Sequence, residues 1–122
     1  MARLLVIDDD IHLRNLLCKL LSKNKDYDVH DAENGEEGLE LIRKFSFDLV
    51  ITDIFMPGEG GLGTIMEICD NHAETKIIAM SGGGNVADVD FLKLACCLGA
   101  QKVLQKPFDT DVFLSTVQDM LH

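Results

Sequence analysis

The stretch Leu4-Leu5-Val6-Ile7-Asp8-Asp9-Asp10 decides the fold, because a short and unbroken apolar run stops abruptly at three carboxylates. A strand that is apolar on both faces is typical of a parallel sheet with helices on either side. The pattern returns at residues 47–53, where an apolar run ends at Asp53. Two buried strands that each end in a carboxylate predict a polar site at one edge of such a sheet.

Apolar runs alternate with helix-period stretches along the whole chain, as in successive βαβ units. We expect strands at residues 4–7, 27–32, 47–53, 76–80 and 102–105, with 27–32 at an edge. We expect helices at residues 11–21, 34–45, 62–70, 86–98 and 109–121, the second and last capped by Asn34 and Asp109. Right-handed crossovers then give one α/β domain over residues 1–122, with a doubly wound five-stranded parallel sheet.

The composition excludes several classes of protein. Eleven Lys and Arg against 21 Asp and Glu give a net charge of −10, so we expect no direct binding to nucleic acid, which requires a cationic surface. No apolar run approaches the roughly 20 residues that cross a membrane. The unbroken run of four apolar residues before Asp8 is too short for a signal-peptide core, which predicts a cytoplasmic protein.

Five polar residues follow or end four of the expected strands: Asp8, Asp9, Asp53, Ser81 and Lys106. The carboxyl ends of parallel strands meet at one edge of the sheet, where ligands of doubly wound folds bind. Three carboxylates gathered there repel one another unless a cation lies among them, and Mg²⁺ prefers oxygen ligands of this kind.

Asp53 stands alone at the end of the central strand, where a phosphoryl donor could approach in line. Phosphoryl transfer depends chiefly on positioning and on charge neutralisation. Mg²⁺, the Lys106 ammonium and the Ser81 hydroxyl together could hold the three phosphoryl oxygens. The sequence therefore predicts that Asp53 accepts a phosphoryl group and forms a short-lived acyl phosphate.

Four motifs, in order and at suitable spacing, carry a family resemblance that covers essentially the whole chain. They are Val6-Ile7-Asp8-Asp9-Asp10, Asp53-Ile54-Phe55-Met56-Pro57-Gly58, Met80-Ser81-Gly82 and Lys106-Pro107-Phe108. Together they resemble the receiver domain of two-component response regulators, of the stand-alone CheY-like type. The resemblance implies a flavodoxin-like (βα)5 fold with strand order 2-1-3-4-5.

For the site, the resemblance implies that Asp53 is the phosphoacceptor, and that Asp8, Asp9, Asp53 and the Phe55 carbonyl hold Mg²⁺. Ser81 and Lys106 would contact the phosphoryl group, and the Lys106–Pro107 bond would be cis. The implied partners are a sensor histidine kinase or a histidine phosphotransfer protein. A downstream effector would bind the face made by the fourth helix, fifth strand and fifth helix. Such a protein catalyses its own phosphorylation and dephosphorylation and is not a metabolic enzyme.

The chain departs from the family pattern at two places. Val103 stands three residues before Lys106, where many members carry an aromatic residue that turns inward on phosphorylation. The segment from Ser81 to Lys106 is about three residues longer than usual, and Gly82-Gly83-Gly84 predicts a loop that orders on phosphorylation. The resemblance also implies that Phe55 and Gly83 influence the lifetime of the phosphoryl group.

Two other interpretations stay open on the sequence, and a third, a flavodoxin, is set aside. A degenerate receiver would act only as a protein-binding scaffold. A haloacid-dehalogenase-type phosphatase would use the Asp8-x-Asp10 motif, but His12 stands where that family has Thr or Val, and 122 residues leave little room for its cap. A flavodoxin would need aromatic residues to stack on flavin, and the chain has no Trp and a single tyrosine, Tyr27.

Overall fold

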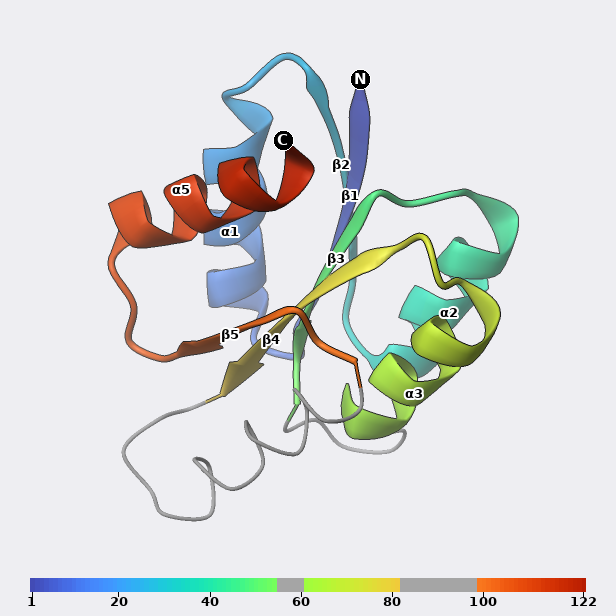
Figure 1. Cartoon of the computed structure of the whole chain (residues 1–122). Helices are drawn as coiled ribbons and strands as arrows, with labels where there is room; N and C mark the ends of the chain where they lie inside the picture. Colours follow the sequence, from blue (N-terminus) through green and yellow to red (C-terminus); the bar gives the residue numbers. More distant parts are fainter. Residues whose placement is uncertain (55–60, 82–98) are drawn as a thin grey trace.

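Five parallel strands form the central layer of the computed structural model, which describes residues 1–54, 61–81 and 99–122 (Figure 1). Their order is β2-β1-β3-β4-β5, so β2 is an edge strand and the predicted order is confirmed. The strands are β1 (Ala2–Ile7), β2 (Tyr27–Ala32), β3 (Leu49–Asp53), β4 (Lys76–Ser81) and β5 (Lys102–Gln105). The register aligns their carboxyl ends: Ile7 pairs with Thr52, Asp53 with Met80, and Ser81 with Gln105.

Helices cover both faces of this sheet, as expected for a doubly wound α/β fold. The described helices are α1 (Ile11–Ser22), α2 (Gly35–Lys44), α3 (Gly61–Asn71) and α5 (Thr110–Leu121). Figure 1 shows α1 and α5 on one face and α2 and α3 on the other. The helix expected at residues 86–98, and the predictions for Phe55 and Gly83, lie outside the described residues. None of the described helices has the length and apolar content that spanning a membrane requires.

The strand side chains divide into two apolar layers, because successive residues of a strand face opposite sides. Leu4, Val6 and Ile51 pack in the layer under α1 and α5, with Phe113 of α5 fully buried among them. Leu5, Ile7 and Val50 belong to the second layer, together with buried residues of α2 and α3. Both faces of β1 are therefore buried, which explains its unbroken apolar run.

The element boundaries differ from the sequence prediction at a few positions. β3 begins at Leu49, whereas the apolar pattern predicted residue 47. Phe47 is buried without being part of the strand, and the Asp48 carboxylate accepts a hydrogen bond from the Arg3 amide at 2.8 Å. The apolar pattern reports burial at Phe47, and burial does not distinguish a strand from the loop that leads into it. At the other end, β4 includes Ser81, which the prediction placed just after the strand.

Asp10 is the N-cap of α1. Its carboxylate accepts hydrogen bonds from the amides of His12 at 3.0 Å and Leu13 at 3.3 Å, which satisfies two of the free N–H groups of the first turn. Asn34 caps α2 through the Glu37 amide, and Asp109 caps α5 through the Asp111 amide. Each of these helices therefore begins at a short polar residue whose side chain accepts hydrogen bonds from amides of the first turn.

Gly99 occupies a position that only glycine fits. Its φ of +129° lies outside the range that L side chains commonly adopt. A Cβ atom added there would lie 2.0 Å from the Cys69 sulfur atom and 3.3 Å from the Cys69 Cβ. The loop that leads into β5 therefore packs directly on α3.

We expect Gly99→Ala to lower the free energy of unfolding by about 3 kcal/mol, through backbone strain and through overlap with Cys69. In a Cys69→Ala background the overlap with sulfur is gone, and the cost of Gly99→Ala should fall to about 1–2 kcal/mol. Urea unfolding of the four proteins measures both values. Equal stability of wild type and Gly99→Ala would contradict the packing described here.

Candidate functional site

The described residues of the predicted site lie together at the carboxyl edge of the sheet. Asp53 and Ser81 are the last residues of β3 and β4, while Asp8 directly follows β1 and Lys106 directly follows β5. The Lys106 amide donates a hydrogen bond of 2.7 Å to the Ser81 carbonyl, which ties the end of β5 to the end of β4. Four strands separated along the chain therefore bring their terminal polar residues to one place, as the sequence predicted.

The Lys106 ammonium bridges two of the carboxylates. Its Nζ lies 3.1 Å from Asp8 Oδ2 and 3.1 Å from Asp53 Oδ2. The Asp8 side chain is fully buried, the Asp53 side chain is 8% exposed and that of Lys106 is 20% exposed. These ion pairs are therefore largely shielded from solvent. Charge interactions in such a shielded site are stronger than at an open surface.

Burial is the largest single influence on the pKa of Lys106 and acts to lower it. The negative charges of Asp53 and Asp8, together with the hydrogen bonds to them, outweigh burial and raise the pKa above its ordinary value. Lys106 is therefore a firmly protonated cation at neutral pH. A permanent positive charge is suited to holding an anionic phosphoryl group.

Both carboxylate oxygens and the backbone amide of Asp8 form hydrogen bonds within the protein. Its Oδ1 atom accepts a hydrogen bond from the Asp10 amide at 2.9 Å, and its Oδ2 atom accepts from Lys106. Its own amide donates to the Ala32 carbonyl at the end of β2, at 3.1 Å. Asp10, the N-cap of α1, therefore has a second role: its backbone amide orients the Asp8 carboxylate.

Arg14 is a contact of this site that the sequence reasoning missed. Its Nη1 donates to the Asp8 carbonyl at 2.8 Å, and its Nε donates to Asp31 Oδ2 at 2.9 Å. The signal in the sequence is weak, because the pattern of this helix is dominated by its apolar residues. A cation one helical turn after Asp10 is near enough to reach back to the turn that carries the aspartates.

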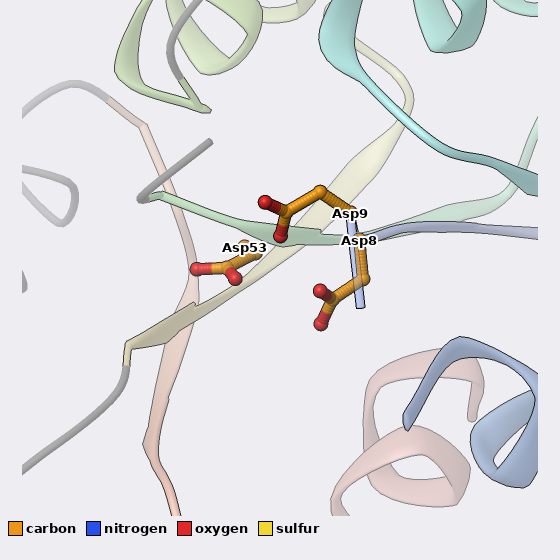
Figure 2. Close-up of side chains that lie close together, drawn as sticks. All are labelled: Asp8, Asp9 and Asp53. Atoms are coloured by element: carbon orange, nitrogen blue, oxygen red, sulfur yellow. The ribbon is translucent and has the colours of Figure 1, made fainter. Parts of the chain in front are cut away.

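Asp8, Asp9 and Asp53 form an acidic cluster that could bind a metal ion. Each offers one carboxylate oxygen, and these oxygens lie within 4.8 Å of one another. Asp8 and Asp9 leave the chain in different directions after β1, and Asp53 lies beside them at the end of β3 (Figure 2). Opposite ligands of octahedral Mg²⁺ are about 4.2 Å apart, so small side-chain adjustments would close this set around the ion. An all-oxygen donor set of this size fits Mg²⁺.

One local feature that the resemblance implied is present directly after Lys106. The Lys106–Pro107 peptide bond is cis. Phe108 then stacks on Phe113 of α5, with 5.6 Å between ring centroids, and this contact anchors the turn after Lys106. Val103 pairs with Ala79 of β4 and packs, half-buried, against the apolar layer under α2 and α3.

An apolar cleft lies beside the acidic cluster, between α1 and the turn after β5. Its volume is about 430 Å³. Asp10 and Lys106 contribute to its wall, and the rest is mainly apolar: Leu13, Leu16, Leu17, Leu20, Pro107, Phe108 and Phe113. Leu16 is half exposed in this cleft. A protein that docks here would have an edge directly next to Lys106.

Residues 4–118 match the response regulator receiver domain family. The chemotaxis protein CheY of Bacillus subtilis (strain 168) is 33% identical over 121 residues, with 98% of each chain covered. The transcriptional regulatory protein DltR of Streptococcus agalactiae serotype III (strain NEM316) is 33% identical over 117 residues. That match covers 95% of this chain and 50% of DltR. Among solved structures, the chemotaxis protein CheY4 of Vibrio cholerae is similar with a TM-score of 0.84 and 28% identity, over 99% of both chains.

We expect Lys106→Met to lower the free energy of unfolding of the metal-free protein by about 2 kcal/mol at pH 7, because two shielded carboxylates lose their counter-cation. The folded-state pKa of Lys106 is raised, so its contribution is complete below the unfolded pKa, about 10.4, and is lost as the pH rises through the folded value. The stability difference between wild type and variant should therefore narrow only above about pH 10.4.

Urea unfolding between pH 7 and pH 11.5 measures this difference. Lys102→Met removes an exposed cation from β5, the strand that Lys106 follows, and serves as the control, with a small and pH-independent effect expected. A Lys106→Met protein as stable as wild type at pH 7 would contradict the bridging role.

Proposed function

The chain belongs to the response regulator receiver domain family, and on this premise we propose that it is a phosphorylation-dependent signalling switch with Asp53 as the phosphoacceptor. The donor is a phosphohistidine of a sensor histidine kinase or of a histidine phosphotransfer protein. Phosphorylation of Asp53 then changes the surface that a downstream protein binds. The protein is cytoplasmic and transmits its state through protein contacts.

One observation carries the proposal: Lys106 Nζ contacts both Asp8 and Asp53 at 3.1 Å. This bridge joins a candidate metal ligand and the candidate nucleophile through one cation. Ser81, fully buried at the end of the neighbouring strand, is tied to the same lysine through its backbone carbonyl. A phosphoryl group on Asp53 would thus have a cation and a hydroxyl on its β4–β5 side.

The transfer step needs no acid or base on this chain. A carboxylate oxygen of Asp53 attacks the phosphorus, an O–P bond forms, and the N–P bond to the donor histidine breaks. The imidazole nitrogen keeps the electron pair of that bond and takes a proton from water, while the phosphoryl group becomes part of an acyl phosphate on Asp53. Lys106 neutralises charge on the transferring oxygens, and the Ser81 hydroxyl donates a hydrogen bond to one of them.

Asp8 and Asp9 would hold Mg²⁺ together with Asp53, and the Phe55 carbonyl is the further ligand that we propose. When bound, the ion supplies charge neutralisation for the phosphoryl oxygens. Neighbouring residues would position the ligands of the ion. Asp10 and Lys106 orient the Asp8 carboxylate, and Asp9 lies in the turn between β1 and α1. Hydrolysis of the acyl phosphate by water returns Asp53 and releases inorganic phosphate, so the signal ends without another protein.

Two surfaces support the partner assignments. The apolar cleft beside Lys106 would receive the protein that carries the phosphohistidine, since Lys106 forms part of its wall and contacts Asp53. The downstream protein would bind the face that includes β5 and α5. Val103 is an aliphatic, half-buried residue packed against the core, so we propose that the signal leaves the site through Ser81 and the segment that follows it.

We expect wild-type protein to gain one phosphoryl group from a small acyl phosphate or from a phosphorylated histidine kinase, and Asp53→Asn to gain none. Removing Mg²⁺ with a chelator should slow the reaction by about a hundredfold or more, because several kcal/mol of charge stabilisation are lost. Intact-protein mass spectrometry with peptide mapping measures the modification. Asp26→Asn, which removes an exposed carboxylate just before β2, should behave as wild type.

The position of the modification separates the alternatives. A phosphoryl group mapped to Asp8 would favour a phosphatase of the haloacid-dehalogenase type. No modification by any donor, with Mg²⁺ present, would leave the protein-binding scaffold as the function.

A further inference from the structure

Arg14 connects the acidic turn to the end of the neighbouring strand. Its guanidinium donates to the Asp8 carbonyl at 2.8 Å and to the Asp31 carboxylate at 2.9 Å, and its side chain is only 11% exposed. We propose that Arg14 is a positioning residue for the Mg²⁺ site: it fixes the peptide that joins Asp8 to Asp9, and Asp31 holds the guanidinium in place. The inference rests on the function proposed above.

The Asp8 carbonyl and the Asp9 amide belong to one planar peptide group. A hydrogen bond to this carbonyl therefore sets the direction in which the chain enters Asp9. The Asp8 carboxylate is already held by Asp10 and Lys106, whereas the Asp9 residue is exposed. Arg14 thus fixes the backbone that determines the direction of Asp9, the exposed metal ligand.

The end of β2 reinforces the same turn. The Asp8 amide donates to the Ala32 carbonyl at 3.1 Å, so both backbone polar groups of Asp8 are bonded. Asp31, the residue before Ala32, accepts from Arg14. The planar guanidinium presents several donors in a rigid fork, and this lets one side chain hold two acceptors in fixed directions. A lysine ammonium is a point charge and would not impose that geometry.

Arg14 could also influence Mg²⁺ binding through its positive charge alone, and this role predicts an effect of the opposite sign on Mg²⁺ affinity. A cation near three carboxylates repels Mg²⁺, so removing it would strengthen binding of the metal. If Arg14 positions the ligands, removing it weakens binding, because partners that orient metal ligands typically contribute tenfold or more to affinity. The sign of the change in affinity therefore distinguishes positioning from electrostatics.

We expect Arg14→Gln to weaken Mg²⁺ binding by about tenfold and Arg14→Lys to weaken it by about threefold, although the lysine keeps the charge. Isothermal titration calorimetry with Mg²⁺ measures the dissociation constants, at a temperature where circular dichroism shows each variant folded. Unchanged or tighter binding by Arg14→Gln, or wild-type binding by Arg14→Lys, would overturn the inference.

As a single variant, Asp31→Asn provides a second test that does not depend on Arg14→Gln folding, because the Asp31 side chain is about half exposed. We expect about threefold weaker Mg²⁺ binding for Asp31→Asn, and no further loss when it is added to Arg14→Gln. Equal, additive effects in both backgrounds would mean that Asp31 does not act through Arg14. If wild type binds Mg²⁺ but these variants bind equally well, only this inference fails; if wild type does not bind Mg²⁺, the proposed metal site fails with it.

Discussion

The balance of charge at the carboxyl edge of the sheet is the constraint on which the rest of this structure depends. Asp8, Asp9 and Asp53 bring three carboxylates within reach of one another, and Asp8 and Asp53 are almost entirely shielded from water. Shielded carboxylates are costly unless they are paired and hydrogen-bonded. Lys106 supplies the pairing, and it does so from a residue 98 positions away in the chain from Asp8. The architecture must therefore deliver β5 to a defined place beside β4.

The parallel register of β4 and β5 places Lys106 beside the carboxylates. The pairing of Ser81 with Gln105 sets the end of β5 level with the end of β4, and the hydrogen bond from the Lys106 amide to the Ser81 carbonyl extends that alignment by one residue. A shift by one residue would turn the lysine to the other face of the sheet. The buried layers on both faces, with Phe113 packed on one of them, make such a shift unfavourable. Core packing and site geometry are thus two results of the same register.

The turn after β1 combines structural and functional contacts in very few residues. Asp10 begins α1 with its carboxylate and orients Asp8 with its amide. Arg14, on the first turns of the same helix, reaches back to the Asp8 carbonyl. The helix that covers the sheet is therefore also the support of the acidic cluster. A change that frays the start of α1 would disturb the site, because the same hydrogen bonds serve both.

Sequence by itself determined the order and type of the described elements and the residues that end β1, β3 and β5, because unbroken apolar runs and their abrupt polar ends depend only on local composition. It ended β4 one residue early, at Met80. It also identified Asp53 and Lys106 as members of one site, since parallel strands end at a common edge. It placed the start of β3 two residues early, because burial at Phe47 looks the same in a strand and in a loop. Only the tertiary structure decided that one lysine bridges two carboxylates and that Arg14 holds the Asp8 carbonyl. Those contacts depend on side-chain directions across neighbouring strands, which a linear pattern does not contain.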